Sequence, residues 1–268
     1  MNNTAAIHRG IVQAIRWLAP AWCLLCRRQH NTACAICADC EAAFSRNRHA
    51  CHRCALPLET THSSEVNRLA FAQLSAQTLC PTCIRHSPAV VSARAPYLMR
   101  TGIRDLIHLW KFQNRPQLST LVADPLVNDL SQAAADLGAP EESTASQRVL
   151  VPIPTQWHRQ VSRGFGRTWL LAQAIRTRHA EPMVVRSWLR NQRFRPPQHE
   201  LSRRERLSNA KSRFRAHPKV AGHHITLLDD VMTTGATVRG AADALRHAGA
   251  RSVEILCLAR TPAPSNAR

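Results

Sequence analysis

The sequence predicts an α/β fold with a mostly parallel central sheet flanked by helices, preceded by a small cysteine-rich segment. Two observations support this class. From residue 148 onward, short apolar runs alternate with helical patterns, as is typical of parallel sheets. Nine of the ten cysteines lie in the first 83 residues. We expect three parts, an N-terminal helix (1–22), the cysteine-rich segment (23–86) and an α/β domain (90–262).

The composition favours an anionic partner. The 268 residues suffice for one large domain or for a main domain plus a small one. The formal net charge of +19 suits nucleic acid, phosphorylated metabolites or a membrane surface. An Arg-rich composition from a GC-rich genome is the alternative, and it accounts for part of the excess. No apolar run of about 18 residues is present, so no transmembrane segment is expected.

The first residues predict an amphipathic helix. Ile7, Ile11, Ile15 and Leu18 recur at helical spacing, and the pattern ends near Pro20. No compact apolar run precedes a small-residue cleavage site, so we expect a helix docked on its own chain rather than a signal peptide. Because no export signal is visible, the expected localisation is cytoplasmic, where disulfides are rare.

Eight of the clustered cysteines form four C-x-x-C units, which predict two structural zinc sites in a double zinc ribbon. Each unit places two thiolates on one turn, and two turns complete a tetrahedral site. Redox thiols would normally form a single C-x-x-C. A cross-braced arrangement stays open, as does replacement of Cys40 by Cys34, and Cys257 is expected in the core. The favoured pairing is sequential: Cys23, Cys26, Cys37 and Cys40, then Cys51, Cys54, Cys80 and Cys83.

The later elements alternate between strand and helix. In chain order we expect a strand at 90–98, helices at 103–110 and 118–130, a strand at 148–154, a helix around 170–175, strands at 182–189 and 225–228, a helix at 237–248 and a strand at 252–259. Parallel sheets bind ligands at the carboxyl ends of their strands. The stretch ITLLDDVMTTGATV, residues 225–238, lies at such an end.

This stretch predicts a site for a sugar phosphate. Backbone N–H groups and hydroxyls at the start of a helix bind anions, and Gly235 permits close approach of the backbone. Neither a Walker loop nor a G-x-G-x-x-G loop is present. The carboxylates of Asp229 and Asp230 would accept hydrogen bonds from ring hydroxyls and balance positive charge on the sugar. The phosphate loop comprises Thr233, Thr234, Gly235, Ala236 and Thr237.

Residues 225–238 resemble the phosphoribosyl pyrophosphate (PRPP) signature of type I phosphoribosyltransferases. Together with the four cysteine pairs, they make the chain similar to the ComF family, which includes GntX-like proteins and is linked to competence and DNA utilisation. The resemblance covers nearly the whole chain. Gly166-Arg167 depart from it, because the family usually has Asn-Gln there. The further matching motifs are Val151-Pro152-Ile153-Pro154, Arg159 with Arg163-Gly164-Phe165, Lys111-Phe112, and Gln198, Leu201, Arg206 and Asn209.

The resemblance implies a type I phosphoribosyltransferase fold for residues 90–262 and a PRPP site within it. Asp229 and Asp230 would hold the ribose hydroxyls and act as the catalytic pair if transfer occurs. The loop 233–237 would bind the 5′-phosphate, and Arg159 and Arg163 would lie near the pyrophosphate. Mg²⁺ would bridge pyrophosphate oxygens and sugar hydroxyls.

A basic arm, expected at about 190–215, stands out by charge. Residues 186–219 hold eleven Lys and Arg against two Glu, with Trp188, Phe194 and Phe214 interleaved. Cations with aromatic rings suit single-stranded nucleic acid. A flexible active-site loop with a solvated face is the equal alternative. The candidate nucleic-acid contacts are Arg190, Arg193, Arg195, Arg203 and Arg204.

We therefore expect a ComF-like protein that binds PRPP and acts in the uptake and handling of single-stranded DNA. DNA-uptake or recombination proteins are its further expected partners. The alternative is an active phosphoribosyltransferase of nucleotide salvage with no direct nucleic-acid role. No nucleobase pocket is recognisable in the sequence, so the acceptor and the occurrence of transfer stay open.

Overall fold

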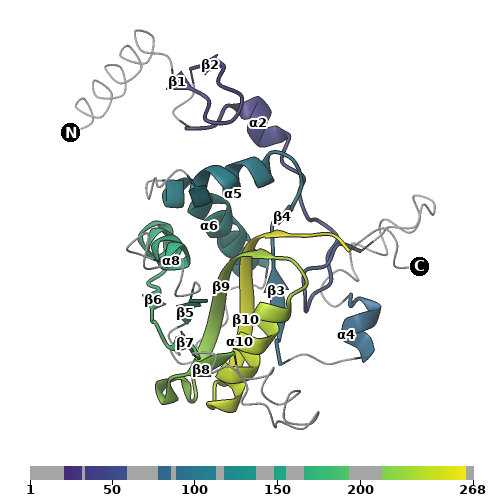
Figure 1. Cartoon of the computed structure of the whole chain (residues 1–268), viewed down its shortest axis with the longest axis vertical. Helices are drawn as coiled ribbons and strands as arrows, with labels where there is room; N and C mark the ends of the chain where they lie inside the picture. Colours follow the sequence, from purple (N-terminus) through teal and green to yellow (C-terminus); the bar gives the residue numbers. More distant parts are fainter. Residues whose placement is uncertain are drawn as a thin grey trace, which may run out of the picture.

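A parallel sheet forms the centre of the computed structural model, which describes residues 21–31, 34–58, 78–85, 89–112, 118–136, 148–154, 166–192 and 213–263. Within these residues the strand order is β3-β10-β9-β5-β6, and β4 also pairs with β10 (Figure 1). Every pairing in this sheet is parallel. The strands are β3 (Ser92–Arg94), β4 (Tyr97–Leu98), β5 (Val149–Pro152), β6 (Val184–Val185), β9 (His224–Met232) and β10 (Ser252–Arg260).

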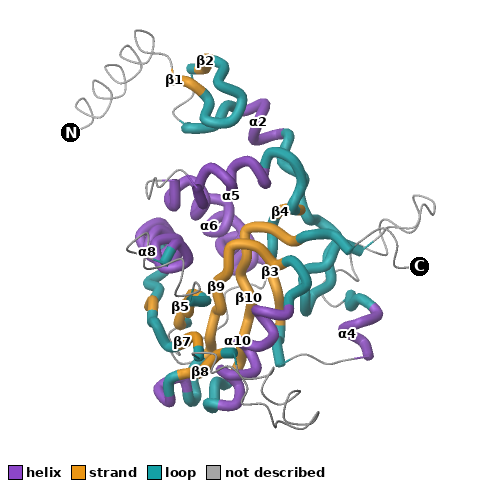
Figure 2. The backbone as a smooth tube through the Cα atoms, in the orientation of Figure 1, coloured by secondary structure: helices purple, strands orange, loops and turns teal. Residues whose placement is uncertain are grey.

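Helices cover both faces of the sheet (Figure 2). Side chains alternate along a strand, so Leu150 and Leu228 pack with one set of helices, whereas Val151 and Leu227 pack on the other face. The first set comprises α5 (Ile103–Phe112), α6 (Leu118–Asp136) and α8 (Arg167–Arg178), and the other face is covered by α10 (Ala236–His247). The expected α/β class with a mostly parallel sheet is confirmed.

Two expected strands are divided in the structure. The strand expected at 90–98 becomes β3 and β4, because Pro96 lacks the N–H that continuous pairing requires. The strand expected at 182–189 ends as β6, since Arg186 and Ser187 are exposed rather than buried in the sheet. The chain then forms β7 (Leu189–Asn191), which pairs antiparallel with β8 (Phe214–Ala216) outside the main sheet. A short 3-10 helix, η1 (Pro218–Val220), follows β8.

The second helix is longer than expected. α6 continues to Asp136 rather than ending near residue 130, and it contains Pro125. A proline inside a helix removes one backbone hydrogen bond. The neighbouring Val122, Ala123 and Leu126 are fully buried, so tertiary packing holds the helix through this point. No helix among the described residues is long and apolar enough to cross a membrane.

The cysteine-rich segment contains little regular structure and packs directly on the α/β part. Asn47 Nδ2 donates to Ala55 O at 2.9 Å and to Ala95 O at 3.1 Å, and Ala93 N donates to His52 O at 2.8 Å. Its elements are β1 (Ala21–Trp22), β2 (Gln29–His30), α2 (Ala38–Ala42) and α4 (Pro81–Arg85). The helix expected at 1–22 lies outside the described residues up to residue 20, and residues 21–22 form β1 instead.

Candidate functional site

The acid pair lies inside the central strand rather than after it. β9 extends four residues beyond the expected end at 228, because it keeps pairing with β10 as far as Met232. On its other side, the pairing with β5 ends at Leu228. Asp229 and Asp230 therefore emerge at the carboxyl end of the sheet, where one neighbouring strand has already ended. Such an edge is where open α/β sheets bind their ligands.

The two carboxylates have different surroundings. Lys111 Nζ, at the end of α5, lies 2.6 Å from Asp230 Oδ2. Asp229 Oδ1 accepts the backbone N–H of Asp230 at 2.9 Å. The pKa of Asp229 is raised to about 7, because burial and the adjacent Asp230 charge outweigh the lowering effects of the Asp230 N–H, Lys111 and Arg213. One acid of the pair therefore has a lysine as its partner, and the other titrates near neutral pH.

The raised pKa of Asp229 predicts that the effect of Asp229→Asn on thermal stability depends on pH. The pKa of Asp229 is about 7 in the folded chain against an ordinary 3.8, so the folded state retains a proton that the unfolded state loses. The stability contributed by Asp229 is complete below pH 3.8 and is lost as the pH rises to about 7. We expect the melting temperature of the variant to exceed that of the wild type by an amount that grows across this pH interval and stays constant above it. Thermal denaturation from pH 4 to 9 measures the difference, and a gain independent of pH would contradict it.

The loop after β9 has the geometry of an anion site. Gly235 occupies the N-cap position of α10 with φ +74°, a conformation that favours glycine. A Cβ at this position would lie 3.0 Å from Arg239 Nη1 and 3.4 Å from Met232 Sδ. Thr234 Oγ1 accepts the N–H of Ala236 at 3.3 Å. The helix begins at residue 236, and its unsatisfied N–H groups and dipole favour a bound anion.

The expected pyrophosphate loop is described only at its two ends. Arg159 and Arg163 lie outside the described residues. At the boundary, Thr168 Oγ1 donates to Ile153 O at 2.7 Å, which fixes the start of α8 against the end of β5. Gly166, one of the two residues that depart from the ComF pattern, is the N-cap of α8.

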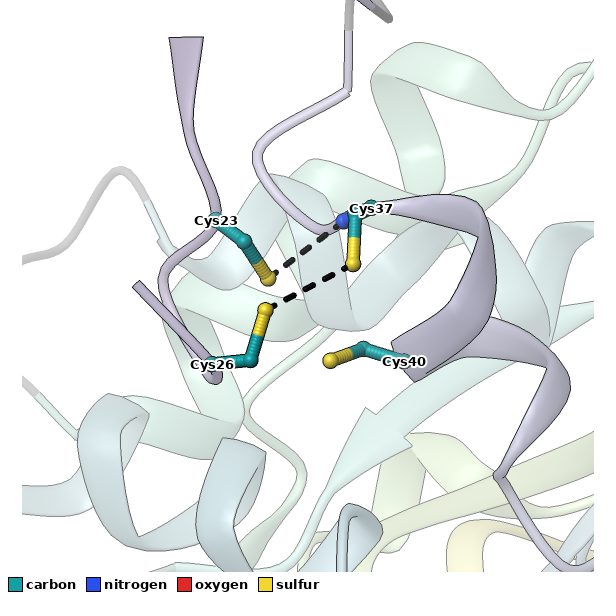
Figure 3. A group of neighbouring side chains, drawn as sticks. All are labelled: Cys23, Cys26, Cys37 and Cys40. Carbon is teal, nitrogen blue, oxygen red and sulfur yellow. Dashed lines mark hydrogen bonds between the residues drawn. The ribbon is translucent and has the colours of Figure 1, made fainter. Parts of the chain in front are cut away.

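Two clusters of four cysteines are present among the described residues, and both follow the sequential pairing. All sulfur atoms within a cluster lie within 4.8 Å of one another, and Figure 3 shows the four thiols of the first cluster pointing toward a common centre. Cys40 completes this cluster, whereas Cys34 is exposed and outside it. Cys257 is fully buried in the core, as expected.

The backbone of both clusters is shaped for metal binding. The residue after the second cysteine has positive φ in each, +58° at Arg27 and +51° at Ala55. Backbone N–H groups also point at sulfur, from Cys37 to Cys23 Sγ at 3.4 Å and from Cys80 to Cys51 Sγ at 3.2 Å. The positive φ angles of Arg27 and Ala55 cost conformational free energy unless another interaction compensates for them. A hydrogen bond from Cys54 and backbone hydrogen bonds outweigh burial and lower the pKa of Cys51 to about 4, which favours thiolate at this position, whereas the same contact with Cys51 and burial raise the pKa of Cys54.

The base of the basic arm is the antiparallel pair β7 and β8. Arg190 is exposed and lies opposite the exposed Arg215 in this pairing. Phe214 is buried in the core, so the expected role of this ring in stacking bases is wrong. Trp188 is half-buried, with its ring 5.2 Å from that of His223. The remaining nucleic-acid candidates lie outside the described residues: Arg193, Arg195, Arg203 and Arg204.

The Lys111 contact with Asp230 was not foreseen from the sequence. The Lys111-Phe112 pair was noticed only as a motif shared with the ComF family. Residues 111 and 230 are distant in the chain, and they meet because α5 covers the face of the sheet that Leu228 faces. The spacing of the apolar residues in α5 predicted which face of the helix is buried. It did not predict which element packs against that face.

The parallel sheet, the helices on both of its faces and the acid pair in its central strand resemble the type I phosphoribosyltransferase fold. The comparisons agree, because residues 157–267 match the phosphoribosyl transferase domain family. The DNA utilization protein YhgH of Escherichia coli strain K12 is 29% identical over 252 residues, covering 90% of this chain and 98% of that protein. Competence protein ComFC of Bacillus subtilis strain 168 is 24% identical, covering 84% of this chain and 95% of that protein.

The chain thus combines a phosphoribosyl transferase domain with two four-cysteine clusters, and its relatives are DNA utilization and ComF competence proteins. This confirms the resemblance to the ComF family. Among solved structures, glutamine PRPP amidotransferase from B. subtilis is 18% identical with a TM-score of 0.35. That match covers 56% of this chain and 30% of the longer enzyme.

Proposed function

We propose that this protein binds PRPP at the carboxyl end of β9. The observation that carries the proposal is the junction of the acid pair with the loop 233–237 at the start of α10. The loop takes the 5′-phosphate, and Asp229 and Asp230 accept hydrogen bonds from the ribose hydroxyls. The two carboxylates are hard oxygen donors that suit a site used by Mg²⁺, which would balance the charge of the pyrophosphate.

Lys111 has a place in this proposal. Its ammonium group neutralises Asp230 in the ligand-free chain and lies at the edge where the pyrophosphate would arrive. The same group can contact a phosphate oxygen once the ribose hydroxyls engage Asp230. If transfer occurs, the acid pair stabilises positive charge on the ribose as the bond from C1 to pyrophosphate breaks.

Isothermal titration of the wild type with PRPP and Mg²⁺ tests the binding proposal. We expect saturable binding with one PRPP per chain. Titration with PRPP in the presence of EDTA, after checking that the cysteine clusters keep their metal, shows the contribution of Mg²⁺. An absence of binding by the folded, metal-containing wild type would refute the proposal.

We propose further that the protein handles single-stranded DNA. The names of its relatives, a DNA utilization protein and a competence protein, favour this role over nucleotide salvage. Arg190 and Arg215 form a pair of exposed, directly opposed cations on β7 and β8. Opposed like charges are destabilising in a two-stranded pair, and a bound phosphate backbone relieves that repulsion.

The double variant Arg190→Ala, Arg215→Ala tests this interface. For single strands, log K falls by about 0.7 per neutralised phosphate for each unit of log salt. We expect the variant to flatten the slope by about 1.4, as measured by fluorescence anisotropy with a labelled oligonucleotide. Arg100→Ala with Arg104→Ala removes the same charge from exposed positions near the start of α5 and should leave the slope unchanged. Equal slopes in all three proteins would contradict the assignment.

A pyrophosphate-release assay distinguishes the proposed role in DNA handling from the alternative, nucleotide salvage. Pyrophosphate formed from PRPP with a free base, in a protein that does not bind oligonucleotides, would support nucleotide salvage. Release that requires an oligonucleotide would join the two activities in one reaction.

A further inference from the structure

Arg260, the last residue of β10, is a buried cation between the phosphate loop and the second cysteine cluster. Its side chain is 6% exposed. Nε donates to Cys54 O at 3.0 Å. Nη1 donates to Met232 O at 3.0 Å, to Thr261 O at 2.8 Å and to Thr233 O. One guanidinium therefore joins a cluster cysteine to the first residues of the loop.

These bonds fix the direction of the loop amides. In a planar trans peptide, the C=O of one residue and the N–H of the next point in opposite directions. Met232 O also accepts the N–H of Thr261 at 3.0 Å, so strand pairing and Arg260 together direct the N–H of Thr233 away from Arg260. The carbonyl of Thr233 is held by Arg260, which directs the N–H of Thr234 away from it. Donors oriented in this way toward the open side of the loop require little reorganisation when a phosphate arrives.

Arg260 carries its positive charge at a buried position. None of the ion pairs found among the described residues includes it, and its partners given above are carbonyl oxygens. Burial lowers the pKa of Arg260, whereas the nearby Cys54 raises it. A cluster of four thiolates around Zn²⁺ carries a charge of about −2. Metal loading of the cluster Cys51, Cys54, Cys80 and Cys83 thus places a counter-charge beside the buried cation.

The junction between the cluster and the loop also contains an open space. A cavity of about 390 Å³ lies between the cluster and the loop, lined by residues that include Cys54, Cys83, Met232, Gly235 and Arg239. Beside such a space, the hydrogen bonds of Arg260 directly connect a cluster cysteine to the start of the loop.

We propose that Arg260 is a positioning residue that makes affinity for the sugar 5′-phosphate depend on metal loading of the second cysteine cluster. This rests on the proposed function of the loop. With metal bound, Cys54 is fixed, Arg260 is held between cluster and loop, and the loop amides face the phosphate. Without metal, the Cys54 carbonyl is no longer held in place, and the loop loses its orientation.

The test compares Arg260→Met and Arg260→Lys with Arg251→Met, an exposed arginine at the opposite end of β10. Titration with ribose 5-phosphate and with Mg²⁺–PRPP measures binding. Hydrogen exchange without ligand measures protection of the Thr261 amide, which donates to Met232 O at 3.0 Å beside Arg260. We expect Arg260→Met to lower both affinities by about tenfold, equivalent to about 1.4 kcal/mol. The Thr261 amide should exchange faster than in the wild type. Arg260→Lys should lie in between, because one ammonium cannot span all the carbonyls, and Arg251→Met should match the wild type.

A Cys83→Ser variant tests the metal link. We expect it to reproduce the loss of affinity and of amide protection while Arg260 is intact. Arg260→Lys serves in place of Arg260→Met if that variant does not fold. Unchanged affinity and unchanged exchange in the folded variants would overturn the proposal. If the wild type binds neither ligand, the proposed function fails, but the exchange rate of the Thr261 amide still decides whether Arg260 and the metal position the start of the loop.

Discussion

Removal of metal from the second cysteine cluster is expected to unfold the cysteine-rich segment. Cys51, Cys80 and Cys83 are buried with only a few half-buried leucines around them, so this segment has little hydrophobic core of its own. Structural zinc contributes about 10–16 kcal/mol of apparent folding free energy in small domains. We expect Cys51→Ser, or treatment with a strong chelator, to abolish the folded segment. Bound zinc should fall from two ions per chain to one in the variant, and to none after chelation.

Elemental analysis measures the bound zinc, and circular dichroism during heating measures the melting temperature. Cys34→Ser is the matched control, because Cys34 is exposed and outside both clusters, so it should keep both metals and the wild-type melting temperature. A purified wild type without metal but with intact structure, or a melting curve unaffected by chelation, would contradict the assignment of structural zinc.

The second large effect is expected from Asp229→Asn combined with Asp230→Asn. Each carboxylate would lose a charge-assisted hydrogen bond to a ribose hydroxyl, worth about 1.5–3 kcal/mol. Two such losses predict a decrease in PRPP affinity of at least about 100-fold. The fold should persist, because the substitution keeps the shape of both side chains and removes the repulsion that contributes to the raised pKa of Asp229.

Isothermal titration with Mg²⁺–PRPP measures the affinity of this double variant. Asp105→Asn with Asp124→Asn changes the net charge equally at exposed positions and should bind like the wild type. If both double variants lost the same affinity, the effect would be one of net charge, and the acid pair would have no specific role.

The elements that position the site could be predicted because local patterns determine them. An apolar strand, two acids, a run of small residues and an amphipathic helix occur consecutively in 225–248, and β9 and α10 form there. The expected end of the strand at 228 was wrong because pairing with β10 carries the acids within the sheet. Hydrogen bonding to a neighbouring strand, and not side-chain polarity, determined that boundary.

The long-range contacts could not be predicted in the same way. Arg260 and Cys54 are separated by 206 positions, yet they share a hydrogen bond. Four identical C-x-x-C units permit several pairings, and only the folded backbone distinguishes the sequential one. Phe214 lies among arginines in the sequence, but its place on β8 against α10 buries it. In each case the deciding information is which segments become neighbours.

A crystal structure of the Mg²⁺–PRPP complex tests the central claim most directly. The account predicts ribose hydroxyls at hydrogen-bond distance, about 3 Å, from the carboxylates of Asp229 and Asp230, with the 5′-phosphate against the amides of 233–237. A sugar phosphate bound elsewhere, for example in the cavity between Cys54 and Arg239, with the acid pair still engaged by Lys111, would contradict it.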